Sequence, residues 1–266
     1  MKVRPPAVAG TFYPSSPAQI RKMVSSYIAE ARPRLPKNGH RVRAVIAPHA
    51  GYAYSGPIAG SSYAALASLK DSVRTVFLFG PSHFVAFEGL ALPDAEAFET
   101  PLGLVRIDPD AYRVASALPQ VIVSAEAHAS EHSLEVQLPF LQEVLPEVCV
   151  LPFAVGDASA NDVVDVMERL LEMQHSAMII SSDLSHYLSY EAAQRADRDT
   201  SDRILRLEGP IQPDRACGAA PLNGLLRFAE DENLEPRLLD LRNSGDTAGD
   251  RSRVVGYGAF SFSNRL

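Results

Sequence analysis

The chain lacks the features that mark several large classes of protein. It contains no tryptophan and only two cysteines among 266 residues, which excludes a disulfide framework and fits a reducing compartment. No segment reaches the roughly 18 apolar residues of a membrane span, and the N-terminus has no apolar stretch of about 7 to 15 residues like that of a secretion signal. We therefore expect a cytoplasmic protein with no membrane partner.

Motifs for phosphate binding are also absent. Neither G-x-x-x-x-G-K-[ST] nor G-x-G-x-x-G occurs, so nucleotide-driven chemistry is not indicated. The net charge of −7 argues against a nucleic-acid partner, because affinity for phosphate backbones comes from clustered Lys and Arg. The hydrophobic content of 46% is typical of a globular protein and argues against disorder.

Short apolar, β-branched runs alternate with longer amphipathic stretches, which predicts an α/β fold. No linker, repeat or low-complexity tract divides the chain, so we expect a single domain over residues 1–266 with a mixed, mostly parallel sheet flanked by helices. The expected strands are 42–47, 74–80, 148–153, 177–181 and 254–262. The expected helices are 17–31, 57–69, 133–145, 160–174, 189–207 and 217–230. Two weaker strands, FEGLALP (87–93) and LGLVRI (102–107), are expected to form an inserted hairpin.

Three of the expected strands end in a turn that delivers a histidine. These residues are His49, His83 and His186, and Asp183 lies in the same turn as His186. Ligands of open α/β sheets bind outside the carboxyl ends of the strands, so we expect these side chains to converge. One such histidine is more often a hydrogen-bonding residue, whereas three favour a shared metal or proton-transfer site.

The two cysteines have different surroundings. Cys217 lies at the start of an expected helix, where the helix dipole favours the thiolate, a form that can bind a metal or act as a nucleophile. The alternative for Cys217 is a small buried apolar side chain, and the sequence does not separate the two. Cys149 lies inside an apolar run and is expected in the core.

The segment from His128 to His132 matches the H-x-x-E-H motif of certain zinc peptidases. In those enzymes both histidines lie on one helix face. Here Pro139 would break or kink a long ligand helix. Glu131 and Glu135 instead suit the first turn of a helix, so the zinc-peptidase interpretation is disfavoured.

Several of these residues belong to a pattern that extends in order along nearly the whole chain. Its segments are Arg4-Pro5, Ala9 to Pro14, Ala47 to Tyr52, Tyr54 to Gly56, Gly80 to His83, Thr100 to Gly103, Glu131 to Glu135, Ser181 to Tyr187, Cys217-Gly218 and Val255 to Tyr257. The pattern resembles the MEMO family, called AmmeMemoRadiSam system protein B in prokaryotes. The resemblance implies a fold like that of the class III extradiol (LigB-type) dioxygenases, which are non-haem iron enzymes.

The resemblance also implies a set of site residues. His49, His83 and Cys217 are expected to line the metal pocket, with Asp183 and His186 beside them. His132 also matches the family signature and is expected near the same pocket, whereas His128 is not part of that signature.

The expected ligands depart from the dioxygenase pattern of two histidines and a carboxylate, because the third position here is Cys217. Two imidazoles and a thiolate suit a divalent metal, with Fe(II) expected first by analogy and Cu or Zn as alternatives. Kinship of fold with an oxygenase does not by itself establish oxygenase activity.

Two main hypotheses of function follow. In the first, the protein is a non-haem iron-dependent redox enzyme, dioxygenase-like or oxidase-like, that acts on a small substrate. There His186 is the catalytic acid/base, Asp183 orients it, and His132 completes the catalytic group. In the second, the pocket is not catalytic and binds a (phospho)tyrosine peptide or a partner protein, with Tyr52, Tyr54 and Tyr187 along the cleft. Metal-assisted hydrolysis is a third option. The prokaryotic family name also suggests radical SAM and AMMECR-type protein partners.

Overall fold

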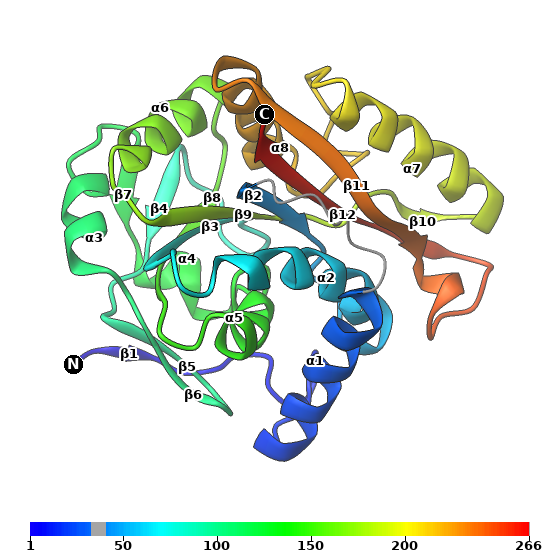
Figure 1. Ribbon diagram of the computed structural model, residues 1–266, viewed down its shortest axis with the longest axis horizontal. Helices are drawn as coiled ribbons and strands as arrows, with labels where there is room; N and C mark the ends of the chain where they lie inside the picture. The colour runs from blue at the N-terminus through cyan, green and yellow to red at the C-terminus, as the bar shows by residue number, and fades with distance from the viewer. Residues whose placement is uncertain (33–40, 266) are drawn as a thin grey trace.

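The computed structural model describes residues 1–32 and 41–265 (Figure 1). The strands within these ranges are β1 (Val3–Arg4), β2 (Val42–Ala47), β3 (Thr75–Pro81), β4 (Leu90–Leu92), β5 (Ala97–Thr100), β6 (Gly103–Arg106), β7 (Val121–Val123), β8 (Cys149–Val155), β9 (Ser176–Ser181), β10 (His186–Leu188), β11 (Leu234–Asn243) and β12 (Val254–Asn264). The α-helices are α1 (Pro17–Ala31), α2 (Tyr52–Leu66), α3 (Pro109–Ala115), α4 (Ala125–Ala129), α5 (Leu138–Val144), α6 (Ala160–Leu171), α7 (Tyr190–Leu205) and α8 (Ala219–Asp231). Short 3₁₀ turns are η2 (Ala67–Leu69), η3 (Glu135–Gln137) and η4 (Ser244–Asp246).

The main sheet is mixed and has nine strands, in the order β10-β12-β2-β9-β3-β8-β4-β7 with β11 paired to β12. Its centre, β2-β9-β3-β8, is parallel, whereas β12 runs antiparallel to β2 and β4 runs antiparallel to β8. The central strands are mostly apolar and almost entirely buried, as expected for a sheet that helices flank on both sides (Figure 1). The α/β fold with a mixed sheet and flanking helices is therefore confirmed.

The parallel arrangement places the carboxyl ends of β2, β9 and β3 at one edge of the sheet. The five strongest expected strands and the helix at 17–31 all form, with ends displaced by two residues or fewer. Helix α2 begins five residues earlier than expected, because Pro57 lies inside the helix rather than at its first turn. The expected helix 133–145 is divided into η3 and α5, with Pro139 in the first turn of α5.

The expected hairpin is wrong. The segment FEGLALP supplies β4, which is buried and lies in the main sheet between β8 and β7. The segment LGLVRI supplies β6, which pairs with β5 in a separate three-stranded sheet that also contains β1. The physical reason is burial: an apolar strand covered on both faces gains more by joining the large sheet than by forming an exposed hairpin.

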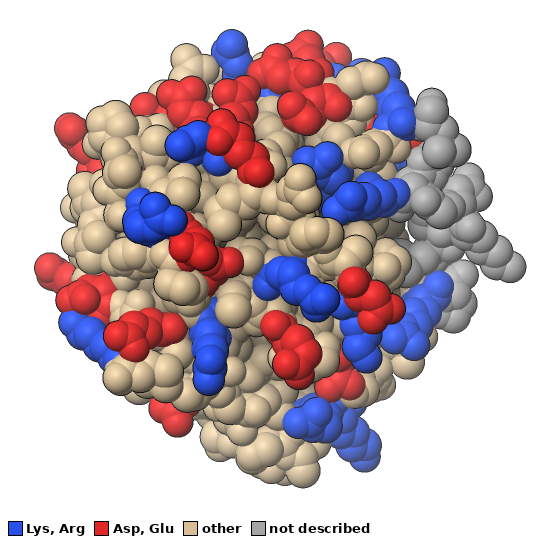
Figure 2. Space-filling model, turned by 60° about the vertical axis from the view of Figure 1, so that its left-hand side comes forward, with Lys and Arg blue, Asp and Glu red and all other residues tan. Residues whose placement is uncertain are grey.

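The surface carries both signs of charge. On the face shown in Figure 2, Lys and Arg are interspersed with Asp and Glu, and several acidic side chains gather near its upper edge. Within the described ranges, no helix has the length and apolar character needed to cross a bilayer.

Candidate metal centre

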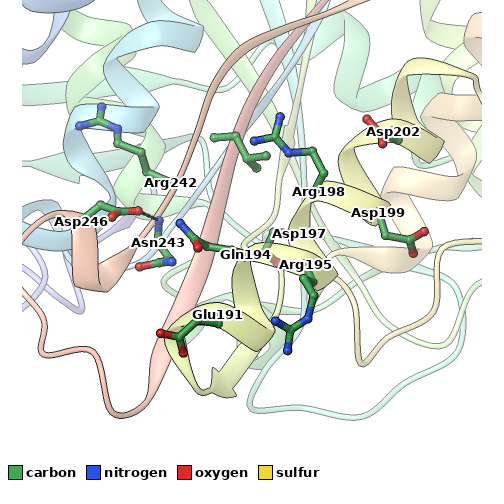
Figure 3. A pocket seen from close by; sticks show the side chains of 11 residues that line it. Glu191, Gln194, Arg195, Asp197, Arg198, Asp199, Asp202, Arg242, Asn243 and Asp246 are labelled. Carbon is green, nitrogen blue, oxygen red and sulfur yellow. Dashed lines mark hydrogen bonds between the residues drawn. The ribbon is translucent and has the colours of Figure 1, made fainter.

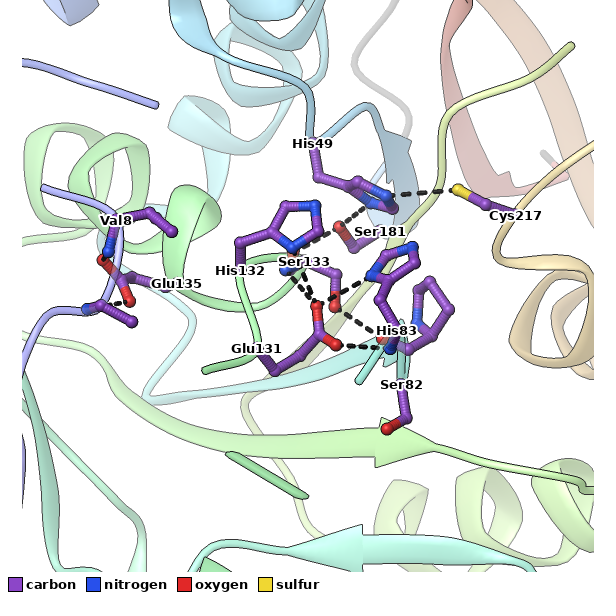
Figure 4. Close-up of polar contacts among 12 residues, drawn as sticks. Val8, His49, Ser82, His83, Glu131, His132, Ser133, Glu135, Ser181 and Cys217 are labelled. Atoms are coloured by element: carbon purple, nitrogen blue, oxygen red, sulfur yellow. Dashed lines mark hydrogen bonds and ion pairs between the residues drawn. The ribbon is translucent and has the colours of Figure 1, made fainter. Parts of the chain in front are cut away.

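Three histidines meet at the carboxyl edge of the sheet. His49 follows β2, His83 follows β3, and His132 comes from the loop between α4 and η3. One ring nitrogen of each lies within 4.8 Å of the corresponding nitrogen of the other two. Figure 4 shows the three rings gathered around a common space, with Cys217 approaching His49. The expected convergence of His49 and His83 is thus observed, and the loop adds His132 to them.

The hydrogen bonds of His49 determine which ring nitrogen is available to a ligand. Its Nδ1 lies 2.9 Å from the Oγ of Ser181. The Ser181 hydroxyl donates its single hydrogen to the carbonyl of Ser133 at 2.6 Å, so it must accept from His49 Nδ1–H. Nε2 of His49 therefore carries the lone pair. Burial, followed by the charges of His83 and His132, holds the pKa of His49 well below its usual value, so the ring is neutral and suited to bind a metal.

His83 is fixed by the carboxylate of Glu131. Its Nδ1 lies 2.9 Å from Oε1 and its backbone N–H donates to Oε2 at 2.6 Å, while Ser133 N–H donates to Oε1 at 2.8 Å. A carboxylate only accepts, so His83 Nδ1 is the donor and Nε2 is free to face the cluster. Burial raises the pKa of Glu131, but the contacts with His83 outweigh it and lower this pKa to about 2. A carboxylate that orients a histidine in this way is the usual outer shell of a metal ligand.

His132 packs between aromatic rings. Its ring centroid lies 4.7 Å from that of His83 and 4.6 Å from that of Phe12. Burial lowers the pKa of His132. Its Nδ1 is buried and has no hydrogen-bond partner among the described residues, although Glu131 Oε1 lies 3.4 Å away. An unsatisfied buried nitrogen beside two oriented imidazoles fits a site that receives a cation.

Cys217 contacts this cluster at the free ring nitrogen of His49. Its Sγ lies 3.2 Å from His49 Nε2, and the backbone N–H of Asp183 donates to Sγ at 3.3 Å. Burial and the nearby Asp183 raise the pKa of the thiol to about 12. This direction is opposite to the expected effect of the helix dipole, because Cys217 precedes the N-cap of α8, Gly218, and is desolvated. Cys149 is half-buried at the start of β8 rather than fully enclosed.

Asp183 and His186 differ in burial, although only two residues separate them in the chain. Asp183 is buried, and its Oδ1 accepts the backbone N–H of His49 at 2.8 Å. Burial raises the pKa of this carboxyl to about 7. His186 begins β10 and is exposed, and its Nδ1 lies 2.8 Å from the carbonyl oxygen of Leu184. The Leu184 carbonyl, rather than Asp183, is therefore the hydrogen-bond partner that orients the His186 ring.

His128 is a core residue. Its Nε2 lies 2.8 Å from the Ala91 carbonyl, and its ring packs edge-on to that of Phe98. Helix α4 ends at Ala129, so His128 and His132 do not share a helix face. The zinc-peptidase interpretation of H-x-x-E-H is excluded by this geometry.

The segment that carries Asp183 and His186 is supported by Asp197 of α7. Asp197 is buried and its Oδ1 accepts the Ser185 N–H at 3.0 Å. The Cα of Gly256 packs so closely on it that a Cβ there would lie 2.0 Å from Asp197 Oδ2. Asp197 also lines a surface hollow of about 630 Å³ between α7 and β11, whose other lining residues include both acidic and basic side chains (Figure 3).

Asp197 should make stability depend on pH. Burial raises its pKa from 3.8 to about 6. The folded chain then holds this proton more tightly than the unfolded chain. The stabilisation that proton binding to Asp197 gives the folded state is therefore complete below about pH 4 and is lost as pH rises through 6. We expect wild type to lose about 3 kcal/mol relative to Asp197→Asn over this interval, measured by urea denaturation. If the difference in unfolding free energy between wild type and Asp197→Asn does not change with pH, the prediction is contradicted.

Sequence reasoning gave no role to several residues that organise the site. The sequence predicted Glu131 as a first-turn helix residue, Arg4 as part of the family pattern, and Ser181 as the end of a strand and part of that pattern. Glu131 had a usable signal, because it directly precedes His132. Their contacts join segments far apart in the chain, so spacing alone could not reveal them.

Comparisons with known proteins agree with this architecture. A family model described as "Memo-like protein" matches residues 4–261. A "MEMO1 family protein" of Methanopyrus kandleri is 37% identical over 97% of this chain and 98% of its own length. A "MEMO1 family protein" of Nitrosopumilus maritimus is 33% identical, covering 98% of this chain and 99% of the relative.

A solved structure shares the fold at much lower sequence similarity. It is an uncharacterized protein of Escherichia coli K12, with a TM-score of 0.51 and 12% identity, and the match covers 82% of this chain and 99% of that one. At this identity the likeness concerns the fold alone.

Proposed function

The chain belongs to the Memo-like protein family, and we propose that it binds a divalent metal and uses it, as non-haem iron, to oxidise a small substrate. In this proposal His49 and His83 hold the metal through Nε2, and Cys217 and His132 supply the remaining donors. The observation that carries the proposal is that three imidazole nitrogens lie within 4.8 Å of one another. Two of the three rings, those of His49 and His83, are oriented by hydrogen bonds at Nδ1.

The donor set suits a redox-active metal. Imidazole and thiolate donors suit iron, copper and zinc, and an iron centre supplies the one-electron and O₂ chemistry that side chains lack. The protein's own groups would handle protons. His186 is exposed with Nε2 unused by its contact to Leu184, and Asp183, with a pKa of about 7, lies beside Cys217.

Space for a small substrate is available beside the centre. A groove of about 880 Å³ is lined by residues 81–82, 85–88, 155–158, 210–213, 219–221 and 223, and by Cys217. This volume lies in the range of pockets for small molecules. A substrate in the groove would reach the centre on the side of Cys217.

The metal content of anaerobically purified protein tests the proposal. We expect about one iron per chain in wild type, and its loss in His49→Ala and His83→Ala, because each removes an oriented imidazole. The iron content of separate His132→Ala and Cys217→Ala variants shows how much each of these two donors contributes to metal binding. His175→Asn, which changes an exposed histidine held by the Ser72 carbonyl, should keep the metal. Plasma mass spectrometry gives the result.

A recognition cleft is the alternative, and exposed rings near the histidines favour it. The exposed fractions of Tyr54, Phe84 and Tyr187 are 43%, 62% and 63%, and Arg253 lies over the Tyr187 ring. Tyr52 cannot contribute as expected, because it is buried and donates to the Val136 carbonyl. If wild type and every variant are metal-free and equally stable after loading with Fe(II), Cu or Zn, the redox proposal fails. Association with radical SAM and AMMECR-type proteins remains a prediction.

A further inference from the structure

We propose that the N-terminal segment, residues 4–13, is a structural part of the metal centre, and that Arg4 is the positioning residue for Glu131 and His132. This inference rests on the proposed metal binding. The segment begins in β1, which pairs with β5, and its following residues contact the loop that carries Glu131 and His132. It contains Arg4-Pro5 and Ala9 to Tyr13 of the sequence pattern, residues to which the proposed chemistry assigns no role.

Arg4 holds the loop at two carbonyls. Its Nε donates to the carbonyl of His128 at 3.0 Å, and its Nη2 donates to the carbonyl of Glu131 at 2.7 Å. These two acceptors lie on either side of the turn at the end of α4. Arg4 therefore fixes the backbone from which the Glu131 side chain reaches His83 and from which His132 follows.

Glu135 ties the far end of the same loop to the N-terminal segment. Its carboxylate pairs with Arg4 Nη1 and accepts the backbone N–H groups of Ala7 and Val8 at 2.8 and 3.0 Å. The hydroxyl of Tyr13 donates to it at 2.5 Å. Glu135 is completely buried, so these four contacts leave its side chain little freedom. His132 thus lies in a loop held on both sides by the N-terminal segment.

Phe12 adds a direct contact. Its ring lies 4.6 Å from the ring of His132, which also packs against the rings of His49 and His83. The backbone carbonyl of Phe12 accepts the N–H of Tyr52 at 2.7 Å, which joins the segment to the start of α2. The segment therefore supports both the backbone and the ring of His132.

The geometry needs the guanidinium group. Arginine presents its N–H donors in a rigid planar fork, and here three of its nitrogens serve three acceptors. Lysine can keep the charge beside Glu135, but its single ammonium on a flexible stem does not reproduce the fork. Arg4→Lys therefore separates positioning from charge.

The test measures binding of Co²⁺ to metal-free protein by calorimetry and by the visible spectrum of the bound ion. We expect Arg4→Lys to weaken binding about 10-fold to 100-fold, the usual effect of losing an outer-shell partner. Arg242→Lys, which alters a half-buried ion pair with Asp240, is the matched control and should bind as wild type does. Thermal unfolding of the metal-free proteins shows whether each variant is folded.

The outcomes are distinct. If wild type binds no Co²⁺, Fe(II) or Zn²⁺, the proposed function fails. If wild type binds Co²⁺ and Arg4→Lys binds it equally well with an unchanged spectrum, only the positioning role is overturned. Should Arg4→Lys not fold, Phe12→Leu provides the second measurement: a loss of affinity supports the segment's role, and unchanged affinity and spectrum contradict it.

Discussion

Replacement of Arg4 by methionine should lower the free energy of unfolding by about 3 to 5 kcal/mol. The arginine side chain is 6% exposed and its partner Glu135 is 0% exposed, so the variant leaves a carboxylate buried without its countercharge. Two loop carbonyls also lose their donors. Guanidinium denaturation, with the slope of the transition held in common, gives the change in stability.

An exposed ion pair provides the control for Arg4→Met. Arg169 and Glu172 form a pair on α6 with side-chain exposures of 50% and 66%. Arg169→Met should change stability by about 1 kcal/mol or less, because solvent screens such pairs. If Arg4→Met costs no more than this control, the buried pair does not hold the N-terminal segment in place.

The second large effect is expected for Gly256→Ala, with a loss of about 3 kcal/mol. The added Cβ would lie 2.4 Å from Asp197 Cγ, well inside van der Waals contact. The neighbours cannot withdraw easily, because Asp197 is held by Ser185 N–H and Gly256 itself donates to the Ser185 carbonyl at 2.8 Å. The expected measurement is again the free energy of unfolding in denaturant.

A double-mutant cycle identifies the cause of the Gly256→Ala effect. Asp197→Ala removes the colliding carboxylate at the cost of leaving Ser185 N–H without its acceptor. The combined variant should then be no less stable than Asp197→Ala alone. Simple additivity of the two losses would show that the collision is not what destabilises Gly256→Ala.

Much of the fold could be predicted from short-range patterns. The central strands are apolar runs, and His49 and His83 follow such runs, so both the sheet and two histidines were accessible from the sequence. Strand β11 was missed because Pro236 and alternating charges hide its pairing with β12. The hairpin was wrong because local pairing was preferred to insertion of β4 into the main sheet.

The interior of the site was less accessible. The family resemblance, and not spacing, placed His132 near the pocket, because a loop with no strand end before it brings this residue to the cluster. The loop is fixed by Arg4, which is 131 positions from Glu135. The thiol of Cys217 was expected to be acidic from its place near a helix start, whereas its burial beside Asp183 reverses the direction. Neither contact nor desolvation can be read from spacing.

The donors of the proposed centre are widely dispersed along the chain. Cys217 Sγ and His49 Nε2 are in contact although 168 positions separate the two residues. An unfolded chain therefore offers a metal only scattered single donors, and tight binding belongs to the native state alone. By mass action, free metal at about 100 times its dissociation constant would add about 2.7 kcal/mol to stability. The amount of folded protein in a cell would then follow the supply of the metal.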